Sequence, residues 1–192
     1  MERLQALGDG VFAVAMTLLV LDLRLPSGDV STSDALWGQL QMLGPNLAAY
    51  LLSFTMLATF WLALHTLLEQ CDRSDRVLAW AVLAFLFFVT TLPFAASVLA
   101  EHIHLRLAVL LYWVNLAALG ATLAWAVLHS ERGLAGPDHR EAVILIRRRL
   151  ILAQSLYALA ALAVLVDPVA SVVSLALVQL FFVVSPRIPF RV

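Results

Sequence analysis

Apolar residues fall into six long segments that are separated by short polar or charged stretches. The segments cover residues 4–23, 45–68, 77–99, 107–128, 150–166 and 168–185. Each is near the ~20 residues that an α-helix needs to cross the hydrocarbon core of a bilayer. The pattern predicts an all-α integral membrane protein with six transmembrane helices in a single domain over residues 1–192, without an internal repeat.

Two of the connections carry signals for the start of a helix. The linker 24–44 begins with polar residues, and Ser33 or Asp34 is placed to cap a short interfacial helix that carries Trp37. The last two segments are separated by Asp167–Pro168 alone. Proline is well tolerated at the first position of a helix, so we expect a tight helical hairpin here.

Composition supports a lipid environment. The chain is 62% hydrophobic and 13% charged, with a mean hydropathy of +0.94, and a soluble core cannot hide so much apolar surface. The first segment is too long for a cleaved signal peptide, contains Asp9 and lacks a small-residue cleavage site. The single cysteine, Cys71, excludes an intramolecular disulfide and a multi-cysteine metal site. The net charge of −1 favours no nucleic-acid partner.

Arginine alone sets the predicted orientation, because the chain contains no lysine. With six spans both termini share one side, and ten arginines fall there: Arg3, Arg73, Arg76, Arg132, Arg140, Arg147, Arg148, Arg149, Arg187 and Arg191. Arg24 and Arg106 fall on the other side. The positive-inside rule therefore predicts that both termini are cytoplasmic. We expect Arg147–Arg149 to mark the membrane boundary and to contact anionic lipid.

The first segment contains an ionisable residue, Asp9, within an apolar stretch. Placing such a residue in a membrane helix costs about 2.5–3.5 kcal/mol on insertion scales, so Asp9 is expected to be functional or paired. Three side chains on the same half of the membrane offer donors to it, namely Arg3, Trp61 and His65.

The same segment carries an apolar stripe on another face. At 100° per residue, Leu7, Val14, Leu18 and Leu21 fall within about 40° of one meridian, and Asp9 lies about 140° away. The stripe is either a packing or lipid-facing surface or the lining of a pathway. Periodicity alone leaves both readings open.

A resemblance bears on this choice. The motif Arg3-x-x-x-Leu7-Gly8-Asp9 is similar to the Arg-x-x-x-Phe-Ser-Asp hallmark that opens the first helix of the transmembrane protein 175 family of potassium channels, in its prokaryotic branch. The likeness continues through Thr17-Leu18-Leu19-Val20-Leu21-Asp22, Phe60-Trp61-x-x-x-His65 and Leu92-Pro93-Phe94. The chain departs from the family pattern where Leu7 and Gly8 replace phenylalanine and serine, and where Val82 stands in place of an asparagine.

The resemblance implies a homotetramer in the plasma membrane of a prokaryote, with four first helices around a central pore for potassium ions. Carried over by position, the pore constriction consists of Val14, Leu18 and Leu21, and Thr17 is the weaker candidate for potassium preference. The residues of the motif and its supporting network are Arg3, Leu7, Gly8, Asp9, Trp61 and His65. No cofactor is implied.

Physical reasoning agrees with a gate of this kind, because a ring of large apolar side chains blocks ions by excluding water. The chain has no Thr-Val-Gly-Tyr-Gly carbonyl filter. The main alternative is a small six-helix secondary transporter or exporter, and a second is a structural membrane protein without transport. Transporters favour interrupted helices at matching positions of two halves, whereas Pro93 interrupts the third segment without a counterpart in the sixth.

Residues with catalytic or metal-binding chemistry are sparse. His102 and His104 lie beside Glu101 in an outer loop, but this group lacks a further ligand and a second shell. No nucleophile–base arrangement or phosphate-binding loop is visible. We therefore expect neither an enzyme nor a metal site.

Overall fold

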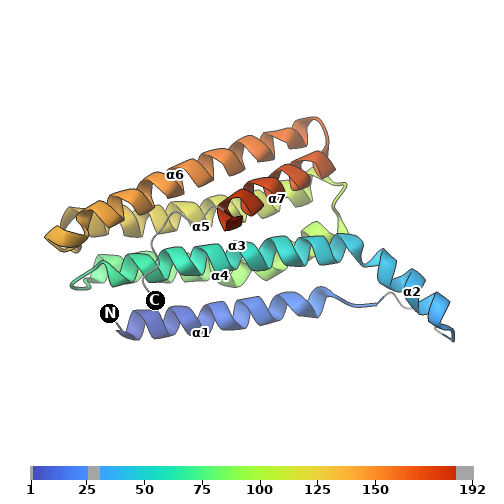
Figure 1. The fold of residues 1–192 in the computed structure, drawn as a ribbon, viewed down its shortest axis with the longest axis horizontal. Coiled ribbons are helices and arrows are strands. Elements are labelled where there is room, and N and C mark those ends of the chain that lie inside the picture. Colours follow the sequence, from blue (N-terminus) through green and yellow to red (C-terminus); the bar gives the residue numbers. More distant parts are fainter. Residues whose placement is uncertain (1, 26–30, 185–192) are drawn as a thin grey trace.

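The computed structural model describes residues 2–25 and 31–184. Their helices are α1 (Glu2–Leu18), η1 (Leu19–Asp22), α2 (Ser33–Met42), α3 (Gly44–Glu69), α4 (Arg76–Glu101), α5 (Arg106–Gly133), η2 (Pro137–His139), α6 (Arg140–Leu162), η3 (Ala163–Leu165) and α7 (Pro168–Val184). The long helices lie side by side in one elongated bundle, with α1 along one edge and α6 along the opposite edge (Figure 1).

The helices fit a lipid bilayer by length and composition. Within the described residues, five stretches are long and apolar enough to cross a membrane: Glu2–Asp22, Gly44–Glu69, Arg76–Glu101, Arg106–Gly133 and Arg140–Leu165. The apolar helix α7 has 17 residues, which at ~1.5 Å per residue is slightly shorter than the ~30 Å hydrocarbon core. The chain is an all-α, multi-pass membrane protein, as the sequence predicts.

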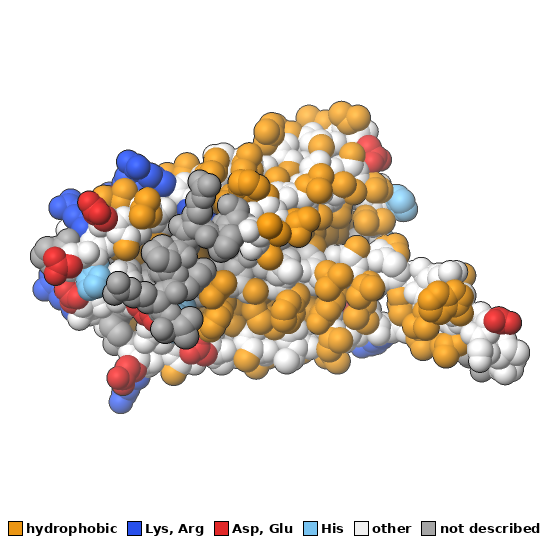
Figure 2. Space-filling model, in the orientation of Figure 1, with side chains coloured by type: hydrophobic (Ala, Val, Ile, Leu, Met, Phe, Trp, Pro, Cys, Tyr) orange, Lys and Arg blue, Asp and Glu red, His pale blue; other side chains and the backbone are white. Residues whose placement is uncertain are grey.

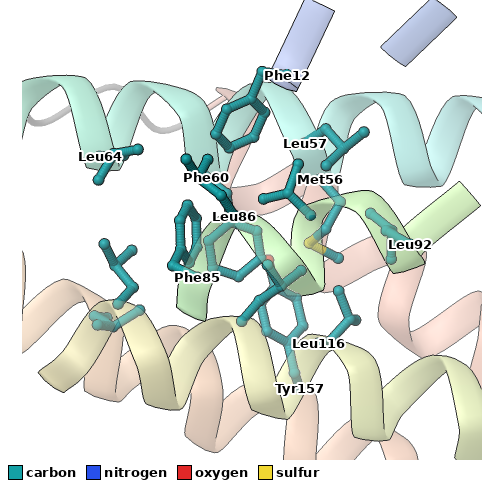
Figure 3. Close-up of a cluster of buried hydrophobic side chains, with 14 of the residues drawn as sticks. Phe12, Met56, Leu57, Phe60, Leu64, Phe85, Leu86, Leu92, Leu116 and Tyr157 are labelled. Atoms are coloured by element: carbon teal, nitrogen blue, oxygen red, sulfur yellow. The ribbon is translucent and has the colours of Figure 1, made fainter. Parts of the chain in front are cut away.

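Buried aromatic side chains fix α1 to the bundle. The ring of Phe85 on α4 lies 6.0 Å from the ring of Phe12 on α1 and 5.9 Å from that of Phe60 on α3, centroid to centroid. These tilted contacts lie in the apolar cluster drawn in Figure 3, together with Met56 of α3 and Leu116 of α5. Tilted aromatic pairs add about 0.5–1.5 kcal/mol to the burial of their area. The inner face of α1 is therefore held against α3 and α4.

Buried polar side chains connect the other helices. Tyr157 of α6 donates to Gln179 Oε1 of α7 at 2.6 Å, and Gln179 Nε2 donates to Thr59 Oγ1 of α3 at 2.8 Å. The hydroxyls of Ser53 on α3 and Tyr112 on α5 lie 3.1 Å apart. Interhelical hydrogen bonds of this kind contribute about 0.6–2 kcal/mol each inside a membrane. They hold α3, α5, α6 and α7 together as the support on which α1 rests.

The predicted fifth segment, 150–166, begins too late. Helix α6 starts at Arg140, so the arginines at 147–149 lie about two turns inside the helix. Arg147 Nη1 is 2.9 Å from Glu131 Oε2 of α5, and this pairing lets the charged stretch continue as helix. Arginine side chains gather at the end of the bundle where α1 and α6 begin (Figure 2).

The two expected connections are both present. A short helix, α2, follows the first linker, but its cap is Thr32, whose hydroxyl accepts the Ala35 N–H, and neither Ser33 nor Asp34. The hairpin at Asp167–Pro168 is confirmed. The Asp167 carboxylate accepts the Ala170 N–H at 2.7 Å and so caps α7 at its first turn.

Candidate functional site on the first helix

Helix α1 is the least buried of the long apolar helices. Only 22% of its apolar stretch is buried, compared with 50% of that of α4. One face packs on the bundle through Gly8, Phe12, Ala15 and Leu19. The opposite face carries the predicted stripe, whose side chains are exposed to 44% (Leu7), 58% (Val14), 44% (Leu18) and 56% (Leu21).

The stripe stays parallel to the helix axis at its Leu21 end, because the chain changes there from α-helix to the tighter 3₁₀-helix. After Leu18 the chain continues as a 3₁₀-helix over Leu19–Asp22. Three residues make one turn of a 3₁₀-helix, so side chains three apart eclipse one another. Leu21 therefore lies directly above Leu18. With ~1.5 Å per residue below Leu18 and ~2 Å above it, Val14 and Leu21 are ~12 Å apart along the axis.

A shallow groove of about 440 Å³ runs along this face. Leu7, Val14 and Leu18 form part of its wall on α1, and Thr90 of α4 forms the other side. The small residues Ala6 and Gly10 also line it. Ala6 and Thr90 were not predicted for this face from the sequence, whereas Gly10 flanks the stripe at helical spacing. The spacing Ala6-x-x-x-Gly10 is the available signal, because small residues four apart let another helix approach closely.

Thr17 lies on the exposed side of α1 beside the stripe. Its hydroxyl donates back to the helix, to Ala13 O at 3.0 Å and Val14 O at 2.8 Å. The hydroxyl proton is therefore engaged by the backbone, while the oxygen keeps lone pairs that can accept from water or contact a cation.

Asp9 has a partner on α3. Of the three predicted donors, Trp61 supplies the hydrogen bond, from Nε1 to Asp9 Oδ1 at 2.7 Å. His65 stacks on Trp61 with ring centroids 5.5 Å apart, and its Nε2 lies 3.1 Å from Glu69 Oε1. Within the described part of the chain, Arg3 is exposed and makes no hydrogen bond to Asp9. The network thus joins α1 to α3 through one carboxylate–indole contact.

The two departures from the family motif lie in different surroundings. A Cβ atom at Gly8 would meet Leu64 Cδ2 at 3.4 Å, so the glycine lies in close contact with α3. Leu7, at the neighbouring position, is exposed on the groove. Val82 is fully buried in α4. A serine at position 8 would fit in ordinary van der Waals contact, so its loss removes a hydroxyl without opening a cavity.

The fold and this face define a polytopic helical membrane protein whose first helix presents an apolar stripe outside its own bundle. Residues 3–93 match the sequence profile of the family described as endosomal/lysosomal potassium channel TMEM175. The chain is 37% identical over 101 residues to a protein of Streptomyces collinus named as a potassium channel, covering 53% of this chain and 48% of that protein.

Two further comparisons extend this result. Human TMEM175, named as an endosomal/lysosomal proton channel, is 35% identical over 100 residues, which are 49% of this chain and 20% of the human protein. The crystal structure of a lysosomal potassium-selective channel TMEM175 homolog from Chamaesiphon minutus superposes with a TM-score of 0.84 at 27% identity, covering 95% of each chain.

Over residues 3–93, just under half of the chain, the sequence is thus similar to the TMEM175 family, and the structural match extends the likeness over 95% of the chain. The matched region spans about half the length of the bacterial relative.

Proposed function

We propose that this chain is the subunit of a potassium-permeable cation channel in which four copies of α1 surround a central pore. The observation that carries the proposal is the exposed apolar stripe on the least buried of the long apolar helices. The stripe of a single subunit is apolar and exposed, and cyclic symmetry turns one stripe per subunit into a closed ring. The structural match over nearly the whole chain is to a protein named as a potassium-selective channel, which supports the channel function.

In this arrangement Val14, Leu18 and Leu21 form three stacked rings over ~12 Å of the pore axis. Rings of large apolar side chains exclude water, and ions then meet a dewetting barrier. Because the sequence has no carbonyl filter motif, selectivity comes from pore width and from polar groups near the rings. Thr17 is our candidate for such a group, since its oxygen is exposed beside Leu18.

The hydrogen bond between Trp61 and Asp9 has a positioning role in this proposal. It ties the face of α1 that carries Asp9 to α3, on the side turned away from the stripe. This contact sets the rotation of α1 about its own axis and so the direction of the stripe. Asp9 therefore supports the pore without lining it.

The orientation of the proposed channel follows from its arginines. We place the end that carries the start of α1 and the α3–α4 and α5–α6 connections in the cytoplasm of a prokaryotic cell, because positive residues concentrate there. Of the ten arginines counted for this side, Arg187 and Arg191 lie outside the described residues.

Reconstitution of the purified chain tests the proposal. Light scattering is expected to give a particle of four subunits of 21.0 kDa each. In liposomes a potassium gradient alone is expected to drive flux, with no second substrate, which separates a channel from an exporter. A monomer or dimer with intact flux would contradict the tetrameric pore.

A further inference from the structure

The apolar stripe of α1 ends beside an arginine. After η1 the chain leaves the helix, and the Arg24 side chain turns back to donate from Nε to Leu21 O at 3.0 Å. Leu21 carries the last side chain of the stripe, so the guanidinium is fixed at the end of the stripe. Within the part of the chain that the structure describes, Arg24 is exposed and forms no ion pair.

The acidic residue at this end, Asp22, lies on a different side of the helix. Leu19 and Asp22 are three apart within the 3₁₀-helix, so their side chains eclipse one another. Leu19 is buried against the bundle, and Asp22 is half-buried on the same side. By the same spacing Leu21 lies above Leu18 on the exposed face. Of the two charges at this end, only the arginine is therefore bonded to a residue of the stripe.

Arg24 also changes the electrostatics of the helix end. The last carbonyls of a helix carry a partial negative charge, equivalent to roughly half an elementary charge, which attracts cations. Here the Leu23 N–H bonds to Val20 O at 3.1 Å, and the Arg24 guanidinium bonds to Leu21 O. A helix end that would favour cations thus carries a full positive charge.

We propose that Arg24 is a specificity-determining residue of the outer pore mouth, where four copies form a positive ring that favours monovalent over divalent cations. The inference rests on the proposed tetrameric pore, in which the Leu21 end of α1 faces the outside. An arginine beside a pore acts as an electrostatic barrier to cations. Four such charges, partly screened by salt, lower the local potassium concentration about two- to threefold. A divalent cation is repelled twice as strongly, so the ring depletes it further.

Single-channel recording of the reconstituted full-length chain tests this role. At low ionic strength, Arg24→Gln should raise the inward potassium conductance about two- to threefold, and the calcium-to-potassium permeability ratio by a similar factor. Both gains should disappear near ~1 M salt, where the screening length is ~3 Å. A change of pore shape, in contrast, would persist in high salt.

Arg106→Gln is the matched control, because Arg106 is the other arginine of the outer side and is also exposed. Its Nη2 donates to Leu165 O at the end of η3, where α6 forms the edge of the bundle opposite α1 (Figure 1). The substitution removes the same charge far from the stripe. It should change neither the conductance nor the permeability ratio.

Two further measurements keep the charge at position 24. Arg24→Lys retains the charge without the guanidinium group, and should leave both quantities unchanged. In the unchanged protein, impermeant N-methylglucamine chloride added outside at a fixed potassium concentration should raise the inward current, because it screens the positive ring.

The outcomes separate this inference from the proposed function. An unchanged protein without potassium flux would overturn the proposed function and this inference with it. In a conducting protein, equal effects of Arg24→Gln and Arg106→Gln would overturn the role of Arg24 alone. So would a gain that persists in high salt, an altered permeability ratio in Arg24→Lys, or an inward current that does not rise when the impermeant salt is added.

Discussion

Trp61 on α3 donates its indole N–H to the Asp9 carboxylate on α1 across 2.7 Å, and this hydrogen bond lies on the side of α1 turned away from the stripe. An aspartate within an apolar helix is thereby given a partner in its own bundle. A polar side chain of this helix is thus engaged in holding it to the bundle, while the apolar stripe stays exposed.

Loss of either partner should destabilise the protein without changing which ions it conducts. We expect Asp9→Ala and Trp61→Phe each to cost about 1–3 kcal/mol, because each leaves a polar group unpaired. The double variant should cost little more than either single one, since both remove the same contact. Thermal melting of the detergent-purified oligomer measures this coupling.

Asp9→Asn provides the matching control, because its amide oxygen can still accept the indole N–H. We expect this variant to assemble and to keep its potassium-to-sodium ratio. A changed ratio in a normally assembled Asp9→Asn protein would mean that Asp9 lines the pathway.

Gly120 on α5 lies directly against the side chain of Gln154 on α6. A Cβ atom at Gly120 would overlap the Gln154 side chain, which approaches Leu116 O from the neighbouring helix. Gly120→Ala should therefore displace the flexible end of the Gln154 side chain, at a cost below the about 1–3 kcal/mol that overpacking usually brings, and adding Gln154→Ala should recover most of it. Gly133→Ala on the same helix meets no atom within 4 Å and should be harmless. Melting temperatures of the three variants provide the test, and no recovery in the double variant would contradict this account.

Asp75 links the start of α4 to the end of α5. Its carboxylate accepts the Leu78 N–H at 2.8 Å and lies 2.7 Å from His129 Nε2. The Leu78 N–H foremost, and His129 next, lower the pKa of Asp75 below its ordinary value. A lowered pKa means that the contribution to stability is present above the ordinary value, near 4, and is lost as the pH falls through the folded-state pKa.

We therefore expect Asp75→Ala to melt at a lower temperature than the unchanged protein at pH 7. Because the unchanged protein loses this contribution in acid, the gap between the two melting temperatures should close near pH 3. A gap that persists in acid would show that the carboxylate charge is not the cause. Melting curves of both proteins between pH 3 and pH 7 measure the difference.

The bilayer explains why most of the helices could be predicted from the sequence. A span must contain ~20 apolar residues whatever its neighbours are, so hydropathy alone locates α1, α3, α4, α5 and α7 closely. The start of α6 could not be found this way. Its arginines interrupt the apolar pattern in sequence, and only the structure shows that the helix begins before them, with Arg147 paired with Glu131 of α5.

The part of the candidate site that lies on one helix could be predicted from the sequence, whereas its contacts with other helices could not. The stripe from Leu7 to Leu21 follows from the 3.6-residue period, and so does its separation from Asp9. Thr90 was not predictable as a wall of the groove, because it comes from a helix more than 70 residues away in the chain. Nor does periodicity reveal that the helix tightens at Leu19 and so keeps Leu21 above Leu18.

The central claim is that Leu18 belongs to a water-excluding gate, and single-channel recording of Leu18 variants beside Leu19→Ala tests it most directly. Leu19, the adjacent residue, is 2% exposed, whereas Leu18 is 44% exposed. Leu18→Ala should raise cation flux, and Leu18→Asn should raise it further by wetting the ring. Leu19→Ala should instead lower stability by about 2–5 kcal/mol without widening the pore. If Leu18→Ala instead lowers both flux and stability, then Leu18 is a packing residue like Leu19, and the proposed gate is wrong.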